Sequence, residues 1–231
     1  MTSARFLRVE VFTDTPGRGN PAGVIVASAP VSDRAARAWA ERMALPGHGF
    51  AWPAAESAWH ARFHTPGSEV TLSGHTALAT AHALRVVHDL GNEPVSLITR
   101  HTTLAIERTD GTQWLALPLP RLTPTDVPRA AVAAVLGLRE DDLRAEVPLV
   151  ATGDTDLLVP LRPTVDLVAL QPDLDALGAL AREHALRGFC TFTTRTDDSE
   201  TAMKSRFFAP HIGLNEDIAT GSVHGPLAVH V

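Results

Sequence analysis

The spacing of apolar positions predicts strands followed by a helix of small residues, and this order occurs twice along the chain. In the first half, several segments either alternate between apolar and polar residues or form short apolar runs, as strands do. These segments are 6–12, 23–27, 50–52, 59–64 and two or three strands within 97–117. The segment 75–88 is built of small residues that are apolar on most faces, which predicts a buried helix. A more polar helix is expected over 33–43, which Ser32 or Asp33 can cap, and the Gly- and Pro-rich residues 45–49 are expected to form a loop.

The second half repeats the pattern. Strands are expected at 147–151, 156–161, 189–193 and 201–209, and helices at 130–138 and 172–186. A second helix of small and apolar residues opens at Ala219 and reaches Val231. Because a helix that is apolar almost all round must be buried, the two such helices predict two lobes, each with a sheet around a central helix. Three prolines within 119–128 place the boundary, so the lobes are expected at 1–120 and 121–231.

The composition is that of a folded protein and excludes several functional classes. Of the 231 residues, 45% are hydrophobic and 20% are charged, which excludes a disordered chain. There is no apolar run of about 18 residues, so we expect no membrane span, and the first residues do not resemble a secretory signal. Lys and Arg number 20 against 26 Asp and Glu, and the net charge of −6 argues against nucleic-acid binding. The single cysteine, Cys190, fits a reducing cytoplasm.

The first candidate site is the start of the second apolar helix. Backbone N–H groups at a helix start are unpaired and carry partial positive charge, so those near Gly221 and Ser222 can bind an anion such as a substrate carboxylate. Asp217, just before them, can move a proton. The alternative is that Asp217 or Thr220 only caps the helix.

The second candidate site uses the same device in the first half of the chain. Gly74 and His75 follow Ser73 at the start of the helix 75–88. The helix dipole there favours a neutral imidazole, which can accept or donate a proton near pH 7. A structural role for a lone histidine is the alternative. If both helix starts face one cleft, they place an acid/base residue on each side of a substrate.

A metal site and a bound cofactor are not expected. His60 and His64 would lie about 13 Å apart on a strand, at about 3.3 Å per residue. His75 and His82 would lie about 10 Å apart on a helix, at about 1.5 Å per residue. No HExxH motif, cysteine pair, phosphate loop or dinucleotide fingerprint is present. Cys190 lies in an apolar strand and is expected to be a core residue.

Three segments, in this order, carry a family resemblance: 9–24 with its Gly-Asn-Pro turn, 73–81 (SGHTALATA), and FFAP at 207–210 followed by EDIATGS at 216–222. They resemble the PhzF-like isomerases of phenazine biosynthesis, relatives of diaminopimelate epimerase. The resemblance implies an α+β, diaminopimelate epimerase-like fold, in which two lobes of mixed β-sheet each wrap a central helix and a cleft separates the lobes. It also implies cytoplasmic homodimers and cofactor-free proton transfer in a small carboxylated substrate.

The resemblance also assigns roles to residues of this chain. Carried over by position, the substrate-binding residues are Asn20, Gly74, Gly221 and Ser222, and the acid/base residues are His75 and Asp217. The family usually has a glutamate as general base after its first helix, where this chain has Gly47. His48 is the nearest catalytic replacement, because Gly47 and Gly49 leave its backbone free to turn inward. A plain loop role for His48 is the alternative.

A second departure concerns length. The sequence stops about ten residues after Ser222, inside the second central helix, where family members continue with further strands. Either this is a shortened variant or the sequence is incomplete. Without those strands, the side chains of Leu227, Val229 and Val231 would have no sheet to pack on. Their exposure would favour a homodimer in which the partner covers them.

Together these features predict an isomerase that shifts a proton in a ring diene or a pyrroline carboxylate. A bacterial specialised-metabolite pathway, such as antibiotic biosynthesis, is the expected setting. The sequence does not identify the substrate itself. The alternative is a non-catalytic relative that binds a ligand or dimerises.

Overall fold

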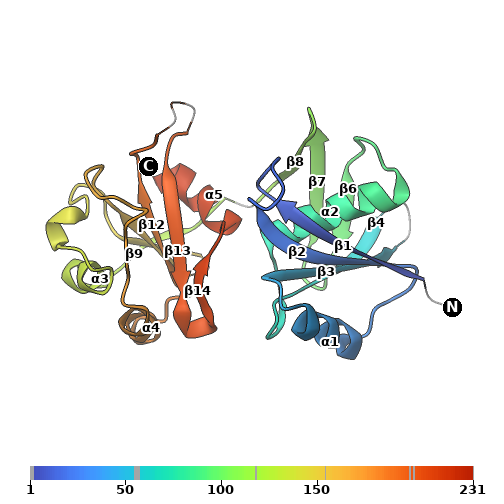
Figure 1. The fold of residues 1–231 in the computed structure, drawn as a ribbon, viewed down its shortest axis with the longest axis horizontal. Coiled ribbons are helices and arrows are strands. Elements are labelled where there is room, and N and C mark those ends of the chain that lie inside the picture. Colours follow the sequence, from blue (N-terminus) through green and yellow to red (C-terminus); the bar gives the residue numbers. More distant parts are fainter. Residues whose placement is uncertain are drawn as a thin grey trace. The chain divides into compact units, whose positions relative to one another are not determined.

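The computed structural model describes residues 3–54, 58–117, 119–153, 155–197, 199 and 201–230. The chain divides into two compact units, Met1–Pro118 and Leu119–Val231. Each unit has its own β-sheet and its own hydrophobic core (Figure 1). No helix among the described residues is long and apolar enough to cross a membrane.

The first unit is built on a mixed sheet. Its strands are β1 (Ala4–Val11), β2 (Asn20–Ala27), β3 (Gly47–Pro53), β4 (Ala58–His64), β5 (Glu69–Val70), β6 (Val95–Ile98), β7 (Thr103–Thr109) and β8 (Thr112–Leu115). They follow the order β1-β2-β3-β4-β6-β7-β8, with β5 paired to β4. The pairs β2–β3 and β4–β6 are parallel, whereas β1–β2, β3–β4, β6–β7 and β7–β8 are antiparallel.

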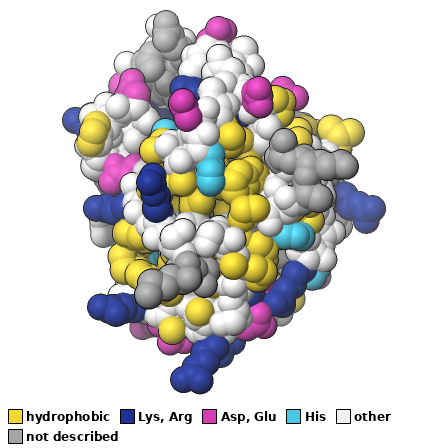
Figure 2. Space-filling model, turned by 90° about the vertical axis from the view of Figure 1, so that its right-hand side faces the viewer, with side chains coloured by type: hydrophobic (Ala, Val, Ile, Leu, Met, Phe, Trp, Pro, Cys, Tyr) yellow, Lys and Arg dark blue, Asp and Glu magenta, His cyan; other side chains and the backbone are white. Residues whose placement is uncertain are grey.

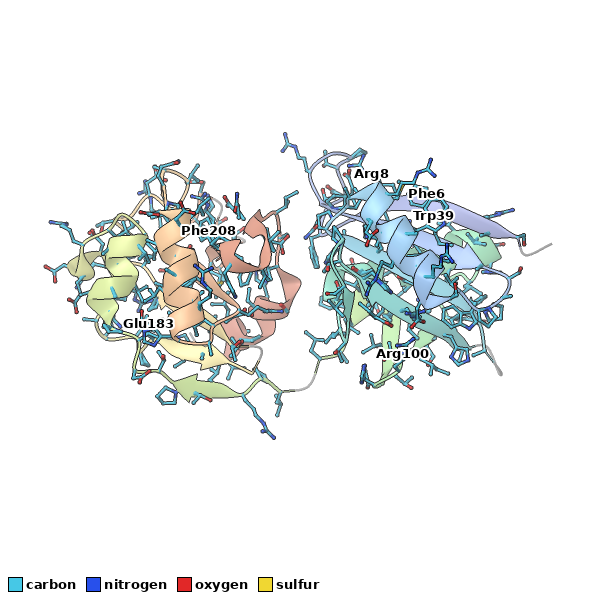
Figure 3. The ribbon with its side chains drawn as sticks, turned by 90° about the horizontal axis from the view of Figure 1, so that it is seen from below. Phe6, Arg8, Trp39, Arg100, Glu183 and Phe208 are labelled. Carbon is cyan, nitrogen blue, oxygen red and sulfur yellow. The ribbon has the colours of Figure 1, made fainter. Side chains whose placement is uncertain are left out.

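Two helices pack on opposite faces of this sheet. The central helix α2 (Gly74–His88) buries a set of small residues against one face. The amphipathic helix α1 (Asp33–Met43) covers part of the other face, where Phe6 of β1 stacks on Trp39 of α1 at a ring-centroid distance of 6.1 Å (Figure 3). Ser32 caps α1 by accepting a hydrogen bond from the Ala35 N–H, as its position predicts. Apolar side chains also reach the surface between charged ones (Figure 2).

Strand β3 differs from the sequence prediction. Residues 47–49 were expected in a loop, but they belong to the strand, and its side chains alternate between the two sheet faces. A Cβ atom on Gly49 would lie 2.1 Å from the Thr80 hydroxyl oxygen, so α2 lies directly on the strand backbone. Glycine in a strand marks such a close approach, which local turn signals do not distinguish from a loop.

The second unit repeats this plan with a second mixed sheet. Its strands are β9 (Leu122–Pro124), β10 (Val150–Thr152), β11 (Asp156–Pro160), β12 (Gly188–Thr193), β13 (Lys204–Ala209) and β14 (Leu214–Asp217). Its helices are α3 (Arg129–Val135), α4 (Leu174–Glu183) and α5 (Gly221–His230), with short 3₁₀ turns η1 (Glu140–Asp142) and η2 (Pro210–Ile212). The strand order is β14-β13-β12-β11-β10-β9, and only β11–β12 is parallel among these pairs.

The helices of the second unit also pack on opposite sheet faces. Val223 and Leu227 of α5 are buried in one cluster with Leu158, Cys190 and Phe207. α3 and α4 contribute to a separate cluster with the side chains that point the other way, such as Leu157 and Phe189. The strand period of two therefore divides the core of this unit into two layers.

The predicted α+β class is confirmed, and most predicted elements are present. The sequence missed β5, β9 and β14, which are too short to show a period. Helix α4 was expected to begin at Pro172, but it begins at Leu174, and the side chain of Asp173 caps it by accepting from the Ala176 N–H.

Candidate functional site

Hydroxyl groups hold the ring of His75 in place at the start of α2. The Ser73 oxygen lies 3.3 Å from His75 Nδ1 and 2.8 Å from the Thr76 hydroxyl oxygen. The Thr76 hydroxyl oxygen lies 3.4 Å from His75 Nε2. Both contacts of the ring nitrogens are long for hydrogen bonds, so the hydroxyl groups position the ring more than they bind it. His75 is half-buried, which fixes the ring without sealing it off.

Gly47 provides the space in which this ring lies. A Cβ atom on Gly47 would be 2.4 Å from His75 Nε2 and 2.2 Å from the Thr76 hydroxyl oxygen. A side chain at position 47 and this His75 conformation therefore exclude each other. The position where the family resemblance places a glutamate is therefore directly against the imidazole of His75.

His48 lies on the other face of β3. Its ring contacts the site where a Cβ on Gly23 would be, at 3.1 Å, and its backbone pairs with His64 of β4. His48 is only 2% exposed, and neither ring nitrogen has a hydrogen-bond partner among the described residues. Burial lowers the pKa of His48, and the neighbouring His64 lowers it further. His48 and His75 lie on opposite sides of β3, because successive strand side chains point to opposite faces, and the charge of His75 also lowers the pKa of His48.

The other predicted residues of the first unit lie on the α2 side. Asn20 is fully buried at the start of β2, two residues before Ala22, which pairs with Gly47 of β3. Asn20 pairs with Val11, a residue of the core that packs on α2. Gly74 has open space around it, since a Cβ there would meet its nearest atom at 4.0 Å. Asn20, Gly74 and His75 are thus gathered on one face of the first sheet.

In the second unit, Asp217 ends β14 in front of α5. It pairs with Phe207 of β13, so both side chains lie on the face that α5 covers. The Thr220 hydroxyl donates to Asp217 Oδ2 at 2.6 Å. This bond holds the half-buried carboxyl group close to Gly221, where α5 begins. The structure therefore brings Asp217, Gly221 and Ser222 together, as the sequence predicts.

A cavity of about 320 Å³ opens beside this carboxyl group. It is lined by Leu167, Val168, Lys204, Ser205, Arg206, Phe207, Asp217, Ile218, Ala219, Thr220 and His224. His224 Nδ1 lies 3.1 Å from the Thr220 carbonyl oxygen, so this nitrogen carries the hydrogen. The cavity has room for a small molecule whose polar groups meet both charges and hydroxyls.

The sequence prediction missed two residues of the second sheet, one of which contacts Ser222 at the start of α5. Arg187 donates to Ser222 Oγ at 3.2 Å and to Asp156 Oδ1 at 2.7 Å, and it makes a second, shorter contact with Asp156 Oδ2. Asp156 begins β11, and Arg187 directly precedes its parallel neighbour β12. No short sequence motif predicts this ion pair, because only the pairing of β11 with β12 brings the two residues together.

The buried thiol does not belong to this site. Cys190 lies in the core of the second unit, where burial and the negative charge of Asp156 raise its pKa to about 12. It therefore stays protonated and is a core residue, as its apolar surroundings predict. No group of three or more His, Cys, Asp or Glu side chains suited to a metal ion occurs within the described ranges.

Comparison with protein families and relatives gives a consistent result. The family model PhzC-PhzF, described as phenazine biosynthesis-like protein, matches residues 9–231. The chain is 34% identical to the uncharacterized isomerase YddE of Escherichia coli O157:H7, over 95% of this chain and 76% of that protein. It is also 34% identical to the uncharacterized isomerase PA3578 of Pseudomonas aeruginosa, over 95% and 78%. These names agree with the predicted enzyme class.

Solved structures share the fold. A PhzF family protein of Bacillus anthracis superposes with a TM-score of 0.88 at 22% identity, covering 100% of this chain and 80% of that one. A hydroxyproline epimerase of Agrobacterium vitis superposes with a TM-score of 0.61 at 11% identity, covering 99% and 77%. The predicted diaminopimelate epimerase-like fold is thus confirmed.

Proposed function

Because this chain belongs to the PhzC–PhzF family of phenazine biosynthesis-like proteins, we propose that it is a cofactor-independent isomerase. The proposed reaction moves a proton between two carbon atoms of a small unsaturated carboxylic acid. One observation carries the proposal: each unit places an acid/base side chain at the start of its apolar helix, His75 on α2 and Asp217 before α5. A ligand-binding protein has no chemical need for both groups.

The proposed carboxylate site is the first turn of α5. The N–H groups near Gly221 and Ser222 and the Ser222 hydroxyl are the donors. When a proton leaves the carbon skeleton, the electron pair spreads over the double bond and the carboxylate. Donors already oriented toward the carboxylate stabilise that charge without rearranging, which lowers the barrier.

The proposed proton transfer leaves both acid/base groups unchanged at the end. The neutral imidazole of His75 takes a proton from one carbon, and the electron pair of the broken C–H bond shifts the double bond. The imidazolium releases this proton to solvent water, and the carboxylate of Asp217 takes a proton from water and delivers it to the carbon at the other end of the delocalised system. The proposal does not include His48, whose side chain lies on the face of β3 opposite to that of Gly47.

The finer assignments follow from what these residues recognise. Helix-start donors select a carboxylate and leave the rest of the ligand to apolar contacts, which supports a ring diene or a pyrroline carboxylate as substrate. Because the proposed substrates are of this class, we also propose that the enzyme acts in bacterial specialised metabolism, including antibiotic biosynthesis. We assign the enzyme to the cytoplasm, since its single buried thiol needs no oxidising compartment.

Incorporation of solvent deuterium tests the proposal. The full chain is incubated in D₂O with β,γ-unsaturated ring carboxylates and pyrroline carboxylates, and with the matching carboxamides as controls. We expect deuterium on carbon and a shifted double bond in at least one carboxylate, and none in its carboxamide. Carboxylates that bind without any labelling of carbon would support the non-catalytic alternative and overturn the proposal.

A further inference from the structure

An ion pair with one buried and one partly exposed member contacts the proposed carboxylate site from the second sheet. The Asp156 side chain is only 2% exposed, and the Arg187 side chain is 35% exposed. Two hydrogen bonds from the guanidinium to the carboxylate fix the plane of the Arg187 group. The guanidinium also lies 5.8 Å from the centroid of the Phe207 ring, which limits its movement on a second side.

The direction of the third hydrogen bond is determined by chemistry. A guanidinium group has donors and no acceptor, so in its 3.2 Å contact with Ser222 the serine oxygen must accept. The hydroxyl hydrogen of Ser222 therefore cannot point at Arg187. It is left to donate to another acceptor at the start of α5.

We propose that Arg187, fixed by Asp156, is a positioning residue that keeps the Ser222 hydroxyl oriented as a donor toward the substrate's carboxylate. This inference rests on the proposed function of the α5 start as a carboxylate site. Arg187 acts through Ser222, since its own charge is already paired with Asp156.

The same arrangement defines the charge of the ligand. Asp156 and Arg187 together are neutral. The two cations that line the neighbouring cavity, Lys204 and Arg206, are paired with Asp197 and Glu216, so the remaining positive potential comes from the helix start, equivalent to about half a charge. That potential matches a monoanionic carboxylate and is poor compensation for a phosphate dianion. The inferred substrate class is therefore a monocarboxylate with no phosphate group.

The test is a double-mutant cycle read by ligand binding. One arm replaces the pair by apolar residues, Arg187→Met with Asp156→Val, because removing Arg187 alone would leave a buried carboxylate without its main partner. The other arm is Ser222→Ala, and the third variant combines both arms. The probe is cyclohex-1-ene-1-carboxylate, followed by the NMR shifts of the Gly221 and residue-222 amides, with its carboxamide and inorganic phosphate as comparison ligands.

Coupling between the arms is the expected result. Each arm should raise the Kd of the carboxylate about tenfold, and the combined variant should also show about a tenfold increase. Arg187→Lys keeps donors for Asp156 and Ser222, so its Kd should lie between the wild-type value and that of the pair variant. The pair Arg144→Gln with Glu146→Gln, a surface ion pair of the same unit, is the matched control and should keep the wild-type Kd.

Other outcomes separate this inference from the function on which it rests. Effects that multiply to about a hundredfold, or a wild-type Kd in the pair variant, would overturn the role of Arg187 and leave the carboxylate site intact. Phosphate binding more tightly than the carboxylate would overturn the inferred ligand charge. If the wild-type amides do not respond to the carboxylate at all, both the inference and the proposed binding site fail. A thermal unfolding curve for each variant shows that the pair variant is folded.

Discussion

His75 Nε2 lies 2.4 Å from the point that a Cβ atom on Gly47 would occupy. No real side chain tolerates that distance, so even a methyl group at position 47 must displace the imidazole or the strand. The glycine at the position of the family's glutamate is thus part of how this chain holds its histidine. The acid/base function that we propose for His75 therefore depends on a glycine that has no reactive side chain.

The first prediction follows from this contact. Gly47→Ala should lower turnover at least tenfold, since the methyl group pushes His75 out of its hydroxyl-bonded position, and Gly47→Glu should not restore a lost base. Deuterium incorporation rates measure the effect. Gly49→Ala is the matched control, because its methyl group would meet Thr80 at 2.1 Å and the methyl group of Thr76 only at an ordinary 3.4 Å. Both variants should lose about 1–3 kcal/mol in the free energy of unfolding, but only Gly47→Ala should lose turnover beyond what the fraction folded explains.

The second prediction concerns Asp217. Asp217→Asn keeps the shape of the side chain and its contact with Thr220 but cannot accept the proton. Turnover should fall by about 10²-fold or more, while the Kd of the carboxylate should change little. Steady-state kinetics and NMR titration measure the two quantities. The control is Glu216→Gln, at the residue next to Asp217, which weakens the ion pair between Glu216 and Arg206. Equal losses of turnover in both variants would remove Asp217 from the mechanism.

The third prediction concerns pH and the buried histidines of the first unit. Burial lowers the pKa values of His48 and His64 in the folded chain. Below the ordinary histidine pKa of about 6.5, the unfolded chain binds protons that the folded chain does not, so stability should fall as the pH falls. Each such histidine contributes at most about 1.4 kcal/mol per pH unit.

Urea unfolding at pH 5.5, 6.5 and 7.5 measures this slope. His48→Leu removes one of the titrating groups and should flatten the dependence below pH 6.5. Because the His48 side chain lies on the face of β3 opposite to that of Gly47, the same variant should keep wild-type turnover relative to the fraction folded. A His48→Leu variant that is stable but inactive would contradict this prediction and make His48 an acid/base candidate again.

The fourth prediction concerns assembly, which we propose to be a homodimer. Ile218, just before α5, and Val229, in its last turn, are 67% and 60% exposed, and solvent exposure of such side chains favours association. Light scattering should give twice the mass of the 24.6 kDa chain at micromolar concentration. Ile218→Asp with Val229→Asp should weaken the dimer, whereas Val168→Asp, at a residue 76% exposed, is the control. A wild-type chain that remains monomeric would contradict the proposal.

The sequence predicts what depends on period and on helix starts. Alternation located most strands, and the small residues of α2 and α5 identified the central helices, because burial imposes those patterns directly. It failed where tertiary contact overrides a local signal. Gly47 and Gly49 look like a loop, although they belong to a strand on which Thr76 and Thr80 rest.

The residues of the candidate site also fall into those that local sequence predicts and those that depend on tertiary contacts. The positions of His75, Asp217 and Ser222 at helix starts were predictable from their own segments, and their roles stay predictions. Arg187 and Asp156 were not predictable, since they are 31 residues apart and only the parallel pairing of β11 and β12 joins them. His48 was chosen for its closeness in sequence to Gly47, but neighbouring strand residues face opposite ways.

Deuterium incorporation in the wild-type chain and in its two acid/base variants tests the central claim most directly. With a turned-over carboxylate in D₂O, NMR resolves label at the carbon that loses a proton and at the carbon that gains one. We predict label at both carbons for the wild type, and at least about 10²-fold slower labelling for both His75→Asn and Asp217→Asn. Wild-type labelling rates in either variant, with the carboxylate still bound, would contradict the claim that this pair of residues moves the proton.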